Sequence, residues 1–317
     1  MKYYVGAYAS SPCNNGWDAQ LETAFYTALK NDPRIQGLEH PFIGQLHSED
    51  DEWFLANIDP NWTFVFTCVP GIMNALKQNP AFGLASCNEE GRQEAVAFLK
   101  QARNAIAKLN AHAGKQVVKA IQIQTAPNQS KAPASTEALK QSLQDIVQWD
   151  WQGAQIVIEH CDTLIEGQVP AKGFLSLTQE IEALREINKR YKRSLGITIN
   201  WGRSVIETRN VQGAIDHIEQ AQTAGLLSGL MFSGASGQET EYGAWRDSHM
   251  PHAKEDNSVG AEGSLMTQAE IHNCLKTASA HELPIVGIKL GIRPENASLK
   301  KRLETIDAAL SIIDACK

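Results

Sequence analysis

The chain has 317 residues, of which 43% are hydrophobic and 21% charged, a composition that can bury a large core. Its 29 basic residues against 36 acidic ones give a formal net charge of −7, which offers no cationic excess to a nucleic acid. No apolar run reaches the roughly 18 residues that a membrane span needs, and the amino terminus does not read as a signal peptide.

Short apolar segments rich in β-branched residues alternate along the chain with longer amphipathic segments. In chain order, the predicted strands are residues 3–9, 35–39, 63–68, 117–124, 155–160, 196–200, 227–232 and 285–290. Helical periodicity follows each strand, as in the stripe of Leu21, Phe25 and Leu29 after the first. Capping signals mark three helix starts, at Ser48 with Asp51 and Glu52, Ser176 with Gln179, and Thr267 with Glu270.

Eight strand–helix units predict a (β/α)₈ TIM barrel, because continuous apolar strands are typical of parallel sheets that are buried on both faces. An open, doubly wound sheet is the main alternative. The sequence has neither the G-x-G-x-x-G nor the Walker pattern of the nucleotide-binding versions of that fold, and eight units favour closure. No linker divides the chain, so residues 1–317 are predicted to form a single domain.

A minimal barrel needs roughly 250 residues, so this chain has a surplus. Most of the surplus follows strands rather than helices, in segments 40–48, 69–90, 161–175 and 233–266. In a barrel these loops all lie on the face where active sites are built. The asymmetry predicts a small-molecule site with long βα loops around it.

Three charged residues stand at the ends of otherwise apolar strands: Glu39, Glu159 and Lys289. An unpaired buried ammonium is costly, so Lys289 is expected to face one or both carboxylates in the barrel mouth. A desolvated Glu159 either pairs with a cation or a metal, or has a raised pKa that suits a base. A plain salt bridge remains the alternative for each carboxylate.

Other polar or aromatic residues at the strand ends are candidate substrate-binding residues, namely His40, Gln122, Gln124, His160, Asn200, Trp201, Arg203 and Arg293. His40 precedes a proline and could only shape a turn. His160 alternates with Glu159 and could point at a helix instead. Trp201 could be core or a platform for sugar stacking.

The loop at about 233–266 carries Trp245, Asp247 and His249 within five positions. A loop of this length in a compact domain is usually a lid, a binding loop or disorder, and its aromatic content argues against disorder. It is interpreted as a lid that brings these three side chains into the site. A purely structural loop is the alternative.

In its layout, and in the Val-Ile-Glu-His stretch at 157–160, the chain resembles the xylose-isomerase-like barrel superfamily of sugar isomerases, epimerases and metal-dependent apurinic endonucleases. The resemblance implies a metal-binding and catalytic role for Glu159. The Trp-Arg-Asp-Ser-His-Met-Pro stretch at 245–251 resembles the hallmark of an uncharacterised bacterial family within that superfamily.

The chain departs from the superfamily's acidic and histidine ligands after strands six, seven and eight, where it has Asn200, Ser233 and Lys289. A cation at the last position is hostile to a divalent metal. The expected cofactor is therefore none, or one divalent metal such as Mn²⁺ or Zn²⁺ held by Glu159 with Asp247 or His249.

The leading hypothesis is a sugar or sugar-derivative isomerase or epimerase. In it, Glu159 takes a proton next to a carbonyl, and Lys289 stabilises the developing oxyanion in place of a metal. Glu39 or His249 returns the proton. Trp201 and Trp245 would stack on the sugar.

Two further hypotheses stay open: a Schiff-base lyase or aldolase that uses Lys289, and a non-catalytic sugar-binding barrel. The expected partner is a small carbohydrate-like molecule, with neither nucleic acid nor membrane, and a homo-oligomer is left open. Six irregularly spaced cysteines favour neither disulfides nor a structural zinc site, which predicts a reduced, cytoplasmic protein.

Overall fold

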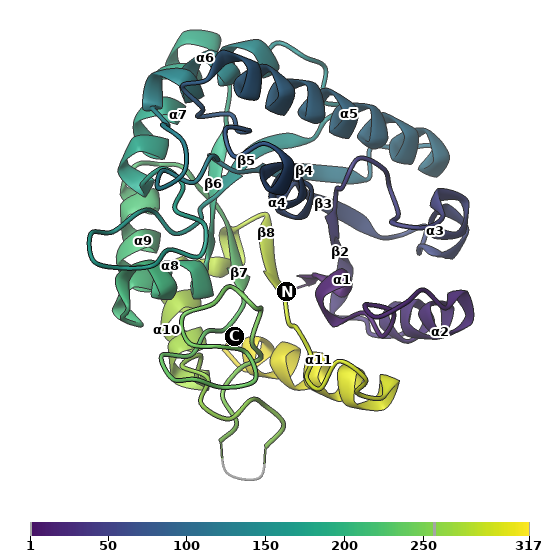
Figure 1. Cartoon of the computed structure of the whole chain (residues 1–317). Helices are drawn as coiled ribbons and strands as arrows, with labels where there is room; N and C mark the ends of the chain where they lie inside the picture. Colours follow the sequence, from purple (N-terminus) through teal and green to yellow (C-terminus); the bar gives the residue numbers. More distant parts are fainter. Residues whose placement is uncertain (1, 256–257, 317) are drawn as a thin grey trace.

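A computed structural model describes residues 2–255 and 258–316. Within these ranges eight parallel strands close into a barrel in which each strand pairs with the next and the last pairs with the first. The strands are β1 (Tyr3–Val5), β2 (Ile35–Pro41), β3 (Thr63–Thr67), β4 (Val118–Ile123), β5 (Gln155–Glu159), β6 (Gly196–Asn200), β7 (Leu227–Phe232) and β8 (Ile285–Ile288). The predicted TIM barrel is confirmed (Figure 1).

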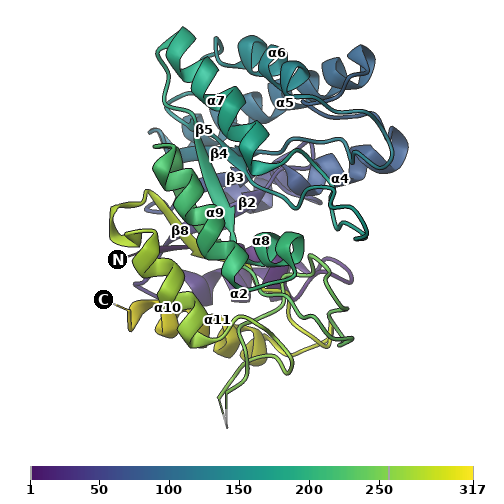
Figure 2. The same cartoon turned by 90° about the vertical axis from the view of Figure 1, so that its left-hand side faces the viewer.

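The helices of the described residues are α1 (Ala7–Ser10), α2 (Ala19–Lys30), α3 (Asp51–Asn57), α4 (Val69–Gln78), α5 (Glu89–Ala113), α6 (Thr136–Ile146), α7 (Leu177–Tyr191), α8 (Trp201–Thr208), α9 (Gln212–Thr223), α10 (Gln268–Thr277), the 3₁₀ turn η1 (Ala280–Glu282) and α11 (Leu299–Asp314). Most of the long helices form the outer layer of the barrel (Figures 1 and 2). None of the helices within the described ranges is both long and apolar enough to cross a membrane.

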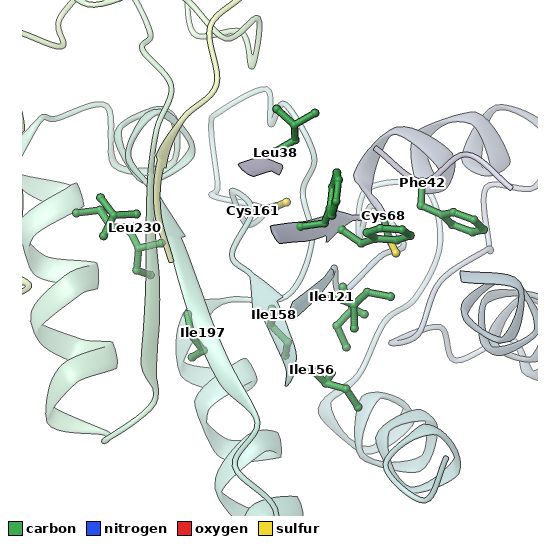
Figure 3. Packing of buried hydrophobic residues seen from close by; sticks show 14 of the residues in the cluster. Leu38, Phe42, Cys68, Ile121, Ile156, Ile158, Cys161, Ile197 and Leu230 are labelled. Carbon is green, nitrogen blue, oxygen red and sulfur yellow. The ribbon is translucent and has the colours of Figure 1, made fainter. Parts of the chain in front are cut away.

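The apolar core has two parts because successive strand residues point to opposite sides of the barrel wall. A small cluster fills the inside and includes Tyr4, Val65 and Met231. A much larger cluster lies between strands and helices, and Figure 3 shows part of it, with Ile121 and Ile158 among the labelled residues. Burial of this layer holds the helices on the barrel and makes its wall a rigid support for the side chains at the strand ends.

Several predicted boundaries were wrong. The first strand ends at Val5, and α1 occupies part of the segment that was predicted to continue it. Asp50, and not Ser48, caps α3, because its carboxylate accepts from two backbone amides of the first turn. Much of the expected loop 69–90 is the helix α4, and α8 follows β6 directly. α4 was not predicted because Pro70 suggested a loop, although proline is well tolerated in the first turn of a helix.

The predicted apolar stripe of α2 was shifted by one residue. Leu21 is one of the exposed large hydrophobic residues, whereas Glu22 is buried. Phe25 and Leu29 are buried as predicted. Glu22 precedes them by three and seven positions, the spacing of one helix face. A carboxylate therefore occupies the inner face of α2.

The predicted lid follows β7 and is fastened to the barrel at several described points. Gly234 forms an antiparallel bridge with Met250, and its amide donates to the Met250 carbonyl over 2.7 Å. The Leu265 amide donates to the Ala235 carbonyl. Tyr242, Met250 and Ala261 form a small apolar cluster of their own. The described part of the loop is thus packed against the barrel.

Candidate functional site

Lys289 lies between two carboxylates in the barrel mouth, as the strand ends predicted. Its Nζ atom is 2.7 Å from Glu39 Oε1 and 3.0 Å from Glu159 Oε1. All three side chains are fully buried. Burying one ammonium between two carboxylates compensates its desolvation and fixes its position. The charged residues of β2 and β5 and the lysine that directly follows β8 therefore converge on one point.

Glu159 is held on all sides by donors. Oε1 accepts from Asn200 and Lys289. Oε2 accepts from the Thr67 hydroxyl and from Gln124 Nε2, and lies 2.9 Å from Arg203 Nη1. Burial alone would raise the pKa of Glu159, but the two cations outweigh it and hold the pKa well below its usual range. Glu159 is thus a fixed anion with no oxygen directed at empty space.

Glu39 has a much poorer set of partners. In the described part of the chain, Lys289 is its one ion-pair partner, and neither carboxylate oxygen makes a well-formed hydrogen bond. Burial, opposed by Lys289 and reinforced by the nearby Glu159, raises the pKa of Glu39 to about 7. Gly6 makes room for it, because a Cβ there would lie 3.1 Å from Glu39 Oε2.

The lid joins this network through Asp247. Its Oδ2 atom lies 3.1 Å from Arg203 Nε and 2.9 Å from Lys172 Nζ. Burial opposes ionisation, but Lys172 and Arg203 together hold the pKa of Asp247 far below its ordinary value. Arg203 therefore connects two buried carboxylates, one on the barrel and one on the lid.

His249 is the second predicted lid residue in the mouth. Its Nδ1 atom is 3.0 Å from Ser233 Oγ and 3.3 Å from Asp247 Oδ1. Its ring meets the Tyr8 ring edge-on, and burial lowers its pKa although Asp247 opposes the shift. The backbone of His249 is left-handed, with φ of 56°, a strained conformation that is common at functional sites.

A cavity of about 340 Å³ opens beside Glu39, at the carboxyl ends of β1 and β2. This volume lies within the range of roughly 300–1,000 Å³ that is usual for small-molecule sites. Its lining includes Tyr8, Trp17, Glu22, Glu39 and His47. Glu22 accepts a hydrogen bond from Trp17 Nε1 over 2.8 Å and lies 3.3 Å from His47 Nε2. The wall therefore offers carboxylates, an imidazole and aromatic faces.

The remaining predicted residues divide into two groups. Gln124, Asn200 and Arg203 lie in the mouth as described above, and Gln122 is buried there without a hydrogen-bond partner among the described residues. The other side chains lie elsewhere. Trp201 is fully buried in the outer core, Trp245 packs on Arg209, and Arg293 pairs with Glu295. His40 is intermediate between the groups: it contributes to the lining of the cavity beside Glu39, and its ring stacks on Phe54.

His160 points away from the mouth, the alternative that strand alternation had left open. Its Nδ1 atom is 2.8 Å from Glu180 and its Nε2 atom 3.3 Å from Glu207. Burial alone would lower the pKa of His160, but these carboxylates raise it to about 10. The side chain is fully buried.

The predicted metal ligands do not fit a divalent ion. Arg203 lies between Glu159 and Asp247, so its guanidinium occupies the position in which a shared metal would bind. Lys289 covers the other oxygen of Glu159. A divalent ion there would have to displace two buried cations, each held by carboxylates, against strong charge repulsion. Arg203 and Lys289 therefore compensate the charge of these carboxylates, as a bound metal ion would otherwise do.

Sequence reasoning missed Tyr8, Glu22, His47 and Lys172. Tyr8 was assigned to a strand, although it lies on α1. Glu22 had a signal, since it stands on the buried stripe of α2. His47 and Lys172 stand in long βα loops, where no periodicity indicates which side chain turns inward.

Comparison with known proteins agrees with the fold. A family described as a domain of unknown function (DUF4862) matches residues 4–305. A Salmonella typhimurium protein, named Uncharacterized protein STM3670, is 34% identical over 314 residues, which are 98% of this chain and 96% of the relative.

Two solved structures illustrate the structural similarity. D-Psicose 3-epimerase from Clostridium cellulolyticum H10, crystallised with D-tagatose, is 14% identical with a TM-score of 0.55, covering 100% of this chain and 98% of that one. A sugar phosphate isomerase/epimerase from Parabacteroides distasonis is 11% identical with a TM-score of 0.53, covering 99% and 94%. The predicted xylose-isomerase-like barrel is confirmed as the fold. The chain belongs to the DUF4862 family.

Proposed function

We propose that this protein is a sugar or sugar-derivative isomerase or epimerase that transfers a proton next to a carbonyl group. One observation carries the proposal: a buried carboxyl, Glu39, lies on the wall of a sugar-sized cavity, and Lys289, at 2.7 Å, is its single cationic partner among the described residues. Proteins of similar fold that are named as sugar epimerases and isomerases support the class of substrate.

Glu39 is the proton-transfer group in this proposal. A general base works best when its pKa is near the working pH, and burial raises the pKa of Glu39 to about 7. Within residues 2–255 and 258–316, its oxygens also meet no hydrogen-bond donor other than the Lys289 ammonium. Glu159, expected from sequence to be the base, is instead a positioning residue because donors surround both of its oxygens.

Lys289 stabilises the oxyanion that forms when the proton leaves. The Glu159 and Glu39 carboxylates outweigh the cost of burial and keep the pKa of Lys289 above its ordinary value, so the cation is always present. When Glu39 accepts a proton, it loses its charge, and the field of Lys289 becomes available to the substrate oxygen. A preorganised cation of this kind needs no reorganisation during the reaction.

His249 supplies the second proton-transfer group. Its pKa is lowered, so the ring is a neutral acid–base group, and Ser233 and Asp247 hold its Nδ1 side. About a fifth of the side chain is exposed, whereas Glu39 is fully buried. An epimerase needs one group that removes a proton and another that returns it.

The Schiff-base hypothesis is not supported by this geometry. An amine nucleophile must be neutral, and it is activated by a lowered pKa. Two carboxylates at 2.7 and 3.0 Å hold Lys289 in the charged form. Sugar binding without chemistry stays as the competing outcome of the experiment.

The test measures exchange of substrate C–H protons with solvent deuterium by NMR, which detects either epimerisation or isomerisation. D-psicose, D-tagatose and D-xylose are incubated in D₂O with wild type, Glu39→Gln and Glu304→Gln, an exposed control on α11. Wild type should label at least one sugar. Glu39→Gln should lower the rate by roughly 100-fold or more, and Glu304→Gln should leave it unchanged.

Full exchange in Glu39→Gln would remove this residue from the mechanism. Saturable binding of a sugar with no exchange by the wild type would overturn the enzyme proposal in favour of a sugar-binding barrel.

A further inference from the structure

A second group of ionisable side chains lies on the outer side of the barrel wall, away from the cavity. His160 directly follows β5, Glu207 stands on α8 and His217 on α9. Glu180, on α7, borders the same place. The three helices lie on the same side of the barrel (Figures 1 and 2). Nothing in the proposed sugar chemistry uses these residues.

Two imidazoles point at one carboxylate from different elements. His160 Nε2 lies 3.3 Å from Glu207 Oε2, and His217 Nε2 lies 3.5 Å from Glu207 Oε1. The ligand atoms of the three side chains all lie within 4.8 Å of one another. Ligands of a tetrahedral Zn²⁺, each at about 2.0–2.1 Å from the ion, stand roughly 3–3.5 Å apart. The group is therefore close to metal-binding geometry before any rearrangement.

The far side of each imidazole is occupied by an oxygen. Glu180 Oε2 lies 2.8 Å from His160 Nδ1, and Ser204 Oγ lies 3.0 Å from His217 Nδ1. An acceptor on Nδ1 keeps a proton on that nitrogen, so that Nε2 is the nitrogen that can give up its proton and bind a metal. The Thr125 hydroxyl in turn donates to Glu180 Oε1 over 2.7 Å.

Because the group is buried, its negative charges must be compensated by positive charge nearby. His160 is fully buried, and side-chain exposure is 9% for His217 and 10% for Glu207. His160 Nε2 makes no hydrogen bond of good geometry to any described residue. Two neighbouring carboxylates, Glu180 and Glu207, need positive charge between them in so dry a place. Either protons on the imidazoles or one divalent cation can supply it.

We propose that His160, Glu207 and His217 bind a divalent transition-metal ion of the Zn²⁺ class. Two imidazoles and a carboxylate, with a further position left for water, suit Zn²⁺ better than Mg²⁺ or Ca²⁺. The ion would fasten α8 and α9 to the end of β5. Since α8 also carries Arg203, the ion would help to position the network in the mouth without touching the substrate.

The test uses the full chain after treatment with a chelator, and calorimetry measures its binding of Zn²⁺. Absorption spectra of the Co²⁺-substituted protein report on the coordination of the ion. Wild type should bind one equivalent in this site and gain thermal stability. Glu207→Gln and His217→Ala should weaken binding by more than about 100-fold, and Ser204→Ala, which removes only the outer contact, by about 10-fold. His272→Ala, on α10, and His249→Ala should bind as wild type does.

Three results would overturn the proposal: no stoichiometric Zn²⁺ binding by the wild type, which would mean that protons fill the group; unchanged binding in folded His217→Ala; or loss of binding in His249→Ala, which would place the ion in the mouth. Circular dichroism checks the fold of each variant. If Glu207→Gln does not fold, His217→Ala and Ser204→Ala together still decide the question.

Discussion

The two sides of the barrel mouth differ in how fully their buried carboxylates are paired. On the side of β5, β6 and the lid, charged groups are closed around one another: Glu159, Arg203, Asp247 and Lys172 form a continuous chain of ion pairs. On the side of β1 and β2, Glu39 pairs with Lys289 and has a cavity beside it. Lys289 joins the two sides, because it pairs with both Glu39 and Glu159.

The contrast between Glu39 and Glu159 shows that neighbours, and not residue type, decide the chemistry of a buried carboxyl. Both are glutamates at the ends of apolar strands, and both are fully buried. Donors on Glu159 hold its pKa low, whereas burial raises that of Glu39 to about 7. The first therefore shapes the site, and the second is suited to move a proton.

The largest loss of folding stability is expected for Glu159→Gln. The change leaves Arg203 and Lys289 facing a neutral amide, and breaking a buried ion pair costs about 3–5 kcal/mol of unfolding free energy. Urea unfolding at pH 7 measures it. Glu39→Gln is the matched control, because it makes the same chemical change on the open side and should cost far less. Equal losses in the two variants would contradict the distinction between the sides.

A smaller effect, which depends on pH, is expected for Glu39→Gln. The pKa of Glu39 is about 7 in the folded chain and about 4.5 in the unfolded one, so between these values the folded chain holds a proton that the unfolded chain has lost. Wild type should therefore lose stability relative to Glu39→Gln as pH rises from 5 to 8, by on the order of 1–3 kcal/mol. Parallel stability curves would show that the Glu39 pKa is ordinary.

The smallest effect on stability and on exchange is expected for Trp245→Ala, in the loop after β7. Trp245 packs under Arg209, with the guanidinium carbon 4.8 Å from the ring centroid, and does not line the cavity beside Glu39. A contact of this type is worth about 0.5–1 kcal/mol at an exposed site. Deuterium exchange into the sugar should be unchanged in the variant. A large rise in KM would instead support the predicted stacking of Trp245 on the substrate.

The sequence was sufficient for the barrel because short strand segments, most of them largely apolar, alternate eight times with segments of helical periodicity. The sequence also predicted that Glu39, Glu159 and Lys289 lie together, since strand alternation and the cost of burying an ammonium both indicate it. These inferences rest on local patterns that parallel strands repeat.

The separate roles of the two glutamates could not be predicted in the same way. The donors that saturate Glu159 include Thr67, Gln124 and Asn200, which come from three different strand ends. Register between strands decides which of these atoms reach a given oxygen, and no sequence pattern carries that register. Lys172 likewise reaches Asp247 from a long loop without any periodic signal.

The central claim is that Glu39 is the carboxyl that exchanges a proton near neutral pH. The most direct measurement is a carboxyl-carbon NMR titration of the chain labelled with ¹³C at the glutamate side-chain carboxyls, with Glu39→Gln used to assign the resonance. We expect one glutamate to titrate near pH 7 and its signal to be missing from the variant. A Glu39 resonance that titrates near the ordinary glutamate value of about 4.5 would contradict this role of Glu39.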